Sequence, residues 1–119
     1  MAPFWGPQTT ISDMFRKYLK KLQTLQLTAL TKGVNVDLCV RSADALLPWV
    51  SVTVTKEGWT YQEKDADGNT PGYFGDYLGL SAYLSREENE QRMSASLAKI
   101  IEKVEEFSHL TLKKEESHV

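Results

Sequence analysis

The residues whose spacing comes nearest to a metal site lie in an acidic segment near the middle of the chain. Asp65, Asp67 and Asn69 follow the one-three-five spacing of a calcium-binding loop, and Asp76 falls at the twelfth position. Such a loop needs a glycine at its sixth position and usually a bidentate glutamate at its twelfth. Here the glycine is Gly68, and the flanking sequence favours strands rather than helices. We therefore interpret the segment as an acidic turn, and the alternative of a cation site stays open.

Cys39, His109 and His118 are the residues closest to nucleophilic or acid–base chemistry. A cysteine nucleophile needs an adjacent base, and no histidine lies near Cys39 in the sequence. Both histidines lie at or beyond the end of the last predicted helix, where a site is hard to enclose. The sequence contains neither a glycine-rich phosphate loop nor a Cys/His cluster for zinc. These features favour a non-enzymatic protein that uses no metal and no cofactor.

Aromatic residues form the most suggestive group for binding. The candidates are Phe4, Trp5, Trp49, Trp59, Tyr61, Tyr73 and Tyr77. If the valines of the predicted strands face the helices, Trp49 faces the opposite side of the sheet, and the pairing register decides whether Trp59 and Tyr61 join it. An aromatic open face could bind a peptide, a partner subunit or unstacked bases. The alternative is that these rings belong to the core or pack under the loop from Asp65 to Gly72.

Two segments with helical apolar spacing must position these residues. The first is predicted to begin at a capping-box pattern at Thr10 and to end before Gly33. The second follows a full capping box at Ser85 and extends to about Leu110. The apolar stripes consist of Ile11, Phe15, Tyr18, Leu22, Leu25 and Ala29 in the first helix and Met93, Leu97, Ile100, Val104 and Phe107 in the second.

Between the two helices the apolar spacing changes to every second residue, which is typical of half-buried strands. Residues 34–41 and 50–55 alternate in this way, and residues 59–62 are predicted to complete a hairpin after a turn at Gly58. A fourth short strand over 73–78 is expected to be weakened by its glycines. The predicted fold class is α+β. A small antiparallel sheet of three to four strands packs on one face against a long N-terminal and a long C-terminal helix, in the order α-β-β-β-(β)-α.

The chain of 119 residues is expected to form one α+β domain over residues 10–110. An extended arm rich in proline and aromatic residues precedes it at 1–9, and a polar tail follows at 111–119. The net charge of −2 gives no general attraction for nucleic acid or anionic lipid. A single cysteine fits a reducing compartment, and no apolar run approaches the ~18 residues that span a bilayer. We therefore expect a cytoplasmic protein that does not enter membranes.

A comparison of element lengths favours self-association. Strands of six or seven residues reach about 20 Å, whereas both predicted helices reach about 33 Å or more. The excess of each apolar stripe must pack on the other helix, on the arm at Phe4 and Trp5, or on a second subunit. We therefore expect a protein-interaction module, such as a small adaptor, inhibitor or accessory subunit. It is expected to bind a protein partner and to self-associate, most simply as a homodimer, through its helices or its N-terminal arm.

Two other classes of function stay open. One is a small-molecule-binding or catalytic domain with a pocket between sheet and helices, lined by Tyr61, Tyr73 and Tyr77 with Asp76 nearby. Tyrosine and aspartate can do acid–base chemistry when burial shifts their pKa. The other is nucleic-acid binding through an aromatic sheet face, for which the predicted strands carry few cations. The sequence identifies neither the partner nor the geometry of an oligomer.

Overall fold

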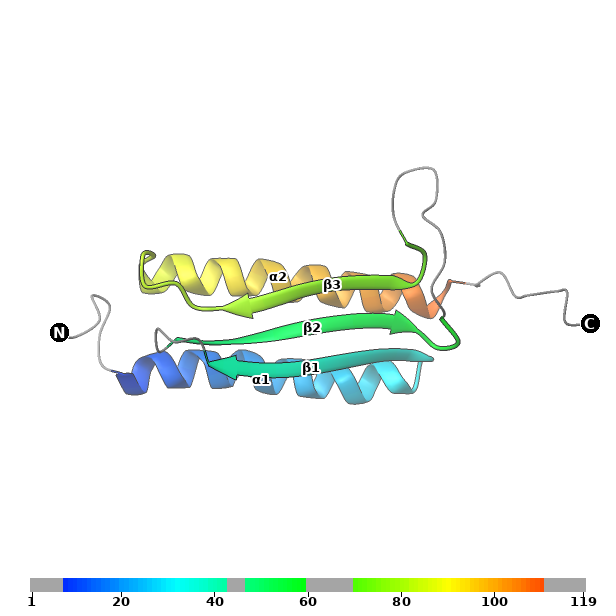
Figure 1. The fold of residues 1–119 in the computed structure, drawn as a ribbon, viewed down its shortest axis with the longest axis horizontal. Coiled ribbons are helices and arrows are strands. Elements are labelled where there is room, and N and C mark those ends of the chain that lie inside the picture. The colour runs from blue at the N-terminus through cyan, green and yellow to red at the C-terminus, as the bar shows by residue number, and fades with distance from the viewer. Residues whose placement is uncertain (1–7, 43–46, 60–69, 111–119) are drawn as a thin grey trace, which may run out of the picture.

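A computed structural model describes residues 8–42, 47–59 and 70–110 of the chain. Its elements are α1 (Gln8–Leu30), β1 (Val34–Ser42), β2 (Pro48–Lys56), β3 (Tyr73–Gly79) and α2 (Arg86–Ser108). The three strands form one antiparallel sheet in the order β1-β2-β3, and both helices cover the same face of it (Figure 1). The α+β fold predicted from the sequence is confirmed.

The register of the sheet separates an apolar face from a mixed one. β1 pairs with β2 along nine residues and β2 pairs with β3 along seven. Because successive side chains of a strand point to opposite faces, Val50, Val52 and Val54 of β2 are buried under the helices. Trp49 and Ser51 therefore lie on the other face, as predicted for Trp49. Pro48 is the first residue of β2, a position where its missing N–H does not interrupt the sheet.

The core lies between the sheet and the two helices. Leu22 and Ala29 of α1 and Ile100 of α2 have no exposed side-chain surface, and the predicted stripe of α2 is buried along its whole length. Ile11 lies where the structure describes no side chains. The other buried apolar residues are Met14, Phe15, Tyr18, Val34, Val36, Val50, Val52, Val54, Leu78, Leu80, Met93, Leu97, Val104 and Phe107. Their removal from water is the main favourable contribution to folding.

The prediction that both helices extend far beyond the strands is wrong. β1 and β2 have nine residues each, which corresponds to about 30 Å. Each helix has 23 residues, which corresponds to about 35 Å. The strands extend beyond the alternating pattern because polar residues at their ends, such as Lys56, still pair along the sheet. One chain therefore covers the described parts of both stripes, and helix length gives no reason for self-association. The arm at Phe4 and Trp5 lies outside the described residues.

The two ends of α1 differ slightly from the sequence prediction. The helix begins at Gln8 rather than Thr10, so Thr10 lies within the first turn. An apolar pattern defines the end of a helix only to within one or two residues. At the other end the helix stops at Leu30, and the turn that follows reaches Gly33, whose φ is +74°. Glycine adopts this left-handed conformation without the strain that a side chain brings.

The predicted hairpin partner of β2 is wrong. Gly58 has a φ of +84°, as a turn requires, but Trp59 is not part of a strand, and residues 60–62 lie outside the described part. β3 pairs with β2 instead. A local turn signal favours the nearest segment, whereas pairing depends on which segment buries apolar side chains beside the valines. Leu78 of β3 does so, with 1% of its surface exposed.

α2 begins at the predicted capping box. The Ser85 hydroxyl accepts a hydrogen bond from the Glu88 N–H at 3.0 Å, and the Ser85 N–H donates to Glu88 Oε1 at 2.9 Å. These bonds satisfy two N–H groups that have no partner within the helix. Glu87 and Glu88 also place negative charge at the positive end of the helix dipole.

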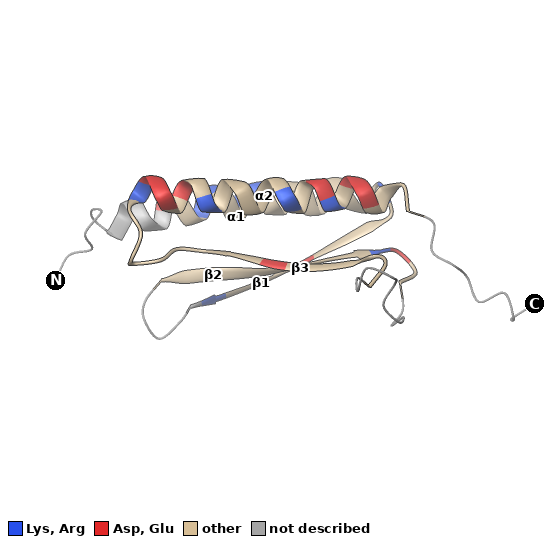
Figure 2. Cartoon of the chain, turned by 90° about the horizontal axis from the view of Figure 1, so that it is seen from above, with Lys and Arg blue, Asp and Glu red and all other residues tan. Residues whose placement is uncertain are grey.

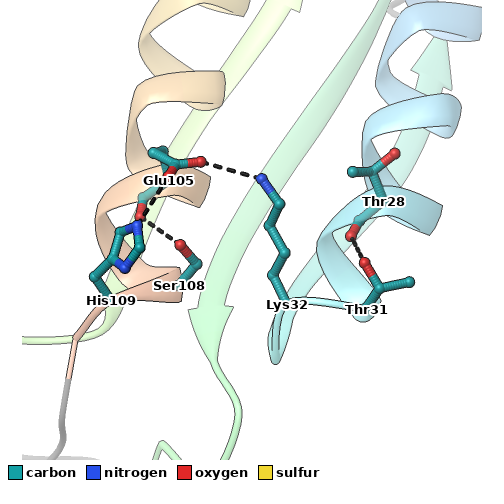
Figure 3. Close-up of polar contacts among 6 residues, drawn as sticks. All are labelled: Thr28, Thr31, Lys32, Glu105, Ser108 and His109. Carbon is teal, nitrogen blue, oxygen red and sulfur yellow. Dashed lines mark hydrogen bonds and ion pairs between the residues drawn. The ribbon is translucent and has the colours of Figure 1, made fainter.

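Polar contacts join the C-terminal ends of the two helices. The Lys32 ammonium donates to Glu105 Oε1 at 3.1 Å, and His109 Nε2 lies 2.9 Å from Glu105 Oε2 (Figure 3). The hydrogen bond with His109, and after it the bond with Lys32, lowers the pKa of the Glu105 carboxyl. All three side chains are largely exposed, so the cluster adds little to stability.

We expect the Glu105 carboxyl to titrate below the ordinary glutamate pKa, and Lys32→Ala to raise that pKa. A carboxyl whose pKa is lowered by folding stabilises the fold above its unfolded pKa, and this contribution is lost as the pH falls through the lowered value. An NMR titration of the side-chain carboxyl across the acidic range measures the pKa in both proteins. If the Glu105 carboxyl had the ordinary glutamate pKa, and Lys32→Ala did not change it, the contacts in Figure 3 would be contradicted.

Candidate functional site

One face of the sheet has no helix over it. Figure 2 shows α1 and α2 together on one side of the strands, with no helix of the described chain on the other side. We call this second side the open sheet face. Its residues are Asn35, Asp37, Cys39 and Arg41 in β1, Trp49, Ser51, Thr53 and Thr55 in β2, and Tyr73, Gly75, Tyr77 and Gly79 in β3.

Aromatic rings lie at both ends of the open sheet face. Trp49 and Tyr77 contact each other edge to face, with ring centroids 6.2 Å apart and planes at 78°. Tyr77 remains 58% exposed and Tyr73 44% exposed. Trp59, which follows β2, packs against Tyr73 with ring centroids 5.5 Å apart. Four of the seven candidate aromatic residues are thus brought together in two pairs, whereas Phe4, Trp5 and Tyr61 lie outside the described residues.

A groove lies beside the Trp49–Tyr77 pair at the end of the sheet. It has a volume of about 610 Å³ and opens to solvent. Tyr83, at 96% exposure, stands at this groove without packing against the core. The side chains that line the groove are mostly apolar: Leu47, Trp49, Tyr77, Leu80, Ala82 and Tyr83. Such a lining suits an apolar side chain of a ligand.

Asn89 holds the loop that forms one wall of this groove. Its Oδ1 accepts from the Ser81 N–H at 2.8 Å, and its Nδ2 donates to the carbonyls of Ser81 at 3.0 Å, Leu84 at 3.3 Å and Ser85 at 3.0 Å. Asn89 has no exposed surface, and it is the only fully buried polar residue in the described part of the chain. Its position on the buried side of α2, one turn before Met93, is the only signal that the sequence offered, and our sequence analysis missed it.

Gly79 lets the Trp49 side chain approach β3. A Cβ atom at residue 79 would lie 2.8 Å from the Trp49 Cβ, closer than real Cβ contacts. The carbonyl of Gly79 accepts a hydrogen bond from Arg92 Nη2 at 2.8 Å, which ties this end of β3 to α2. The position of the Trp49 ring, and with it the shape of the groove, therefore depends on a residue without a side chain.

The open sheet face carries almost no net charge. Its only charged residues are Asp37 and Arg41, whereas the acids and bases of the described chain gather mainly on the helices (Figure 2). The Arg41 guanidinium lies 5.9 Å from the centre of the Trp49 ring, within cation–π range. A nearly neutral aromatic surface of this kind is suited to an uncharged protein surface more than to a phosphate backbone.

The residues expected to line a pocket between sheet and helices are divided between the two faces of the sheet. Tyr73 and Tyr77 belong to the open sheet face, and Asp76 lies on the helix side at the edge of β3, because consecutive residues of a strand alternate. The Asp76 carboxylate accepts the N–H of Tyr77 at 2.8 Å. Core side chains occupy most of the space between sheet and helices, and a hollow of about 220 Å³ at its edge, between β3 and α2, is lined by Asp76, Tyr77 and Arg92 among others. Tyr61 lies outside the described residues, so only the other three can be placed.

A second polar cluster joins α1 to α2 near their N-terminal ends. Lys17 forms an ion pair with Glu90, and the Tyr18 hydroxyl donates to Glu90 Oε2 at 3.3 Å. The bond with Lys17 lowers the pKa of Glu90, and burial raises the pKa of Tyr18. At neutral pH the carboxylate is therefore ionised and the phenol protonated. This arrangement links the two helices and contains no activated nucleophile.

The other chemically active side chains of the described residues stand apart from one another. Cys39 is exposed and free, and the His109 ring lies within hydrogen-bond distance of the exposed Glu105 carboxylate. Within residues 8–42, 47–59 and 70–110, no three His, Cys, Asp or Glu side chains are placed to hold a metal ion. His118 and the acidic turn from Asp65 to Asn69 lie outside these ranges. Neither helix of the same ranges is long and apolar enough to cross a membrane.

Comparisons of the chain with protein-family models, with curated proteins and with solved structures found no match. The geometry and chemistry of the open sheet face are therefore the basis for a functional proposal.

Proposed function

We propose that the protein is a non-enzymatic protein-interaction module whose open sheet face binds an extended segment of a partner protein. The proposal depends on one observation: Tyr73 and Tyr77, with Trp49 beside them, lie on a sheet face that no described helix covers. Aromatic side chains are enriched among the residues that dominate binding energy at protein interfaces. A small adaptor, inhibitor or accessory subunit would use such a surface.

The spacing of the aromatic pairs defines the size of the partner segment. Tyr73 and Tyr77 lie four residues apart in β3, which corresponds to about 13 Å along the strand. An extended segment of about five residues can therefore contact both pairs. Its anchor would be an apolar or aromatic side chain in the groove beside Trp49, and the rest would be largely uncharged, to match the nearly neutral face.

A cytoplasmic location is part of the same proposal. Cys39 is the only cysteine of the chain, and it is exposed and free. A reducing compartment keeps an exposed thiol in this state.

Peptides selected from a random displayed library supply a defined ligand for the test. We expect these peptides to carry an apolar or aromatic anchor, and Tyr77→Ala to weaken their binding at least tenfold. Such a loss corresponds to about 1.4 kcal/mol, which is modest for an aromatic residue at the centre of an interface. Calorimetric titration measures the affinity of each protein for the same peptide.

Leu27→Ala is the matched control for this experiment. Leu27 is an apolar side chain on α1 that is 68% exposed, so its loss should leave the affinity unchanged. Equal affinities for the wild type and Tyr77→Ala, or a loss seen only with Leu27→Ala, would rule out the open sheet face as the binding surface. Binding of single-stranded DNA with an affinity that falls steeply with added salt would instead support the nucleic-acid alternative.

A further inference from the structure

The two edges of the sheet differ in how their backbone groups are occupied. At the β3 edge the Asp76 carboxylate accepts the Tyr77 N–H, and Arg92 donates to the Gly79 carbonyl, both at 2.8 Å. Side chains that occupy edge groups in this way prevent a further strand from pairing there. The β3 edge is therefore blocked at two positions by the chain itself.

Among the described residues, a side chain occupies the β1 edge at the N-terminal half of the strand. Gln26 Nε2 donates to the Val36 carbonyl at 2.7 Å. Because alternate residues of a strand direct their N–H and C=O groups to the same edge, Val36, Leu38 and Val40 all direct these groups away from β2. Among the described residues, no hydrogen bond occupies the outward N–H and C=O groups of Leu38 and Val40.

The C-terminal half of β1 is also sterically accessible. Val40 lies on the helix side of the sheet and is nevertheless 52% exposed. Figure 2 shows β1 diverging from the helix layer toward its arrowhead. This half of the strand therefore offers an uncovered edge to another strand.

The charged residues on either side of Cys39 in β1 are self-complementary. Asp37 and Arg41 lie on the open sheet face two residues before and two residues after Cys39. They are about 13 Å apart along the strand, too far to pair with each other. The ion pairs of the described residues involve neither of them. A second β1 running antiparallel would supply the missing partner for both.

We propose that two copies of the chain pair antiparallel along residues 37–41 of β1, with Cys39 on the two-fold axis. In this register Asp37 lies opposite Arg41 of the second copy, twice in each dimer, and Leu38 lies opposite Val40. A pair centred on Asp37 would place two aspartates opposite each other, and one centred on Arg41 would place two arginines opposite each other. Like charges in facing positions destabilise a sheet. A pair centred on Leu38 or on Val40 forms neither ion pair.

This pairing joins two three-stranded sheets into one sheet of six strands. Both pairs of helices lie on one side of it, and the two open sheet faces form one surface on the other. The role of this joint surface rests on the proposed function, because the dimer would present it to the partner protein. Peptide binding at Tyr77 of one copy does not itself require the dimer, so the two proposals can fail separately.

Oxidation of the full chain with diamide tests the register. As the S–S bond forms, two Cys39 thiols lose two electrons and two protons, which diamide accepts. Facing residues in antiparallel strands lie close enough for a disulfide, and a chain with one cysteine can form only this covalent dimer. We expect Asp37→Arg and Arg41→Asp each to slow dimer formation at least tenfold, and the double variant to restore the wild-type rate.

The control for register carries its single thiol elsewhere on the same strand. In Asn35→Cys/Cys39→Ser the two thiols of the proposed dimer would be about 26 Å apart, so cross-linking should be at least tenfold slower than in the wild type. An equal rate for this control, or charge variants that cross-link as fast as the wild type, would overturn the pairing.

Light scattering measures the association without oxidation. At tens of micromolar we expect a dimer for the wild type and a monomer for Asp37→Arg. A monomeric wild type that binds peptides through Tyr77 would overturn the pairing and leave the proposed function intact. A dimer whose cross-linking is slowed as expected by the charge variants and the register control would support the pairing even if no peptide bound through Tyr77. The proposed function alone would then fail.

Discussion

Asn89→Ala is expected to lower the free energy of unfolding by about 3–4 kcal/mol. The substitution leaves the Ser81 N–H without its acceptor and the Leu84 carbonyl without its donor. The carbonyls of Ser81 and Ser85 lose one of two donors and keep the backbone N–H groups of Leu84 and Asn89. A buried polar group without a partner costs about 1–3 kcal/mol, and water entering the smaller side chain's place relieves part of the total. Urea denaturation followed by circular dichroism measures the change.

Gln91→Ala is the control for that experiment. Gln91 lies two residues further along α2 on its exposed face, so its loss should change the stability by less than about 0.5 kcal/mol. If Asn89→Ala cost no more than Gln91→Ala, the four hydrogen bonds of Asn89 would not hold the loop at the groove.

Gly79→Ala is expected to lower the free energy of unfolding by about 2 kcal/mol, because excess volume in a packed site costs about 1–3 kcal/mol. The new Cβ would lie 2.8 Å from the Trp49 Cβ and 3.6 Å from its Cα, so the backbone of β2 or β3 must shift. This movement displaces the Trp49 ring, and peptide binding at the groove should weaken as well. Urea denaturation and calorimetric titration measure the two effects.

Gly75→Ala provides a matched comparison in the same strand and on the same face. There the new Cβ would meet the Tyr73 hydroxyl at 3.4 Å, an ordinary contact with the end of a side chain that can move. Alanine in a strand interior is favoured over glycine by about 0.5–1 kcal/mol, so this variant should be as stable as the wild type or slightly more so. A Gly75→Ala protein destabilised as much as Gly79→Ala would show that strand geometry, and not the approach of Trp49, requires glycine.

The sequence was sufficient to predict features that depend on local spacing. The apolar stripes of both helices, the capping box at Ser85 and the turn at Gly33 each need only a few neighbouring residues. The alternation at Val50, Val52 and Val54 likewise predicted which side of the sheet Trp49 occupies. These features follow from the geometry of a single helix or strand.

The features that the sequence did not predict depend on contacts between distant segments. β2 pairs with a strand that begins 17 residues after β2 ends, whereas the turn at Gly58 indicated a partner immediately after it. The lengths of β1 and β2 depend on mutual pairing of polar residues, which carry no apolar pattern. Asn89 acts by holding the loop at Ser81, and Gly79 acts by leaving room for the Trp49 side chain. No residue spacing within a single helix or strand indicates either contact.

The same reasoning explains which part of the candidate site could be anticipated. Strand alternation predicted the face that Trp49 occupies, whereas Tyr73 and Tyr77 were candidates by residue type alone. The groove beside them could not be foreseen, because Leu47, which precedes β2, meets Leu80 and Tyr83 of the loop after β3 only in the folded chain. The residues expected to line a site between sheet and helices could not be assigned to one face from the sequence, because the alternation of a strand places Asp76 and Tyr77 on opposite faces of β3.

The most direct test of the open sheet face as the interaction surface is amide NMR on labelled protein titrated with a selected peptide. We predict that the largest shift changes occur in β2 and β3, around Ser51 and Tyr77, and that the amides around Leu27 and Ile101 on the helices do not move. Changes confined to the helices, with the amides of Ser51 and Tyr77 unmoved, would contradict it.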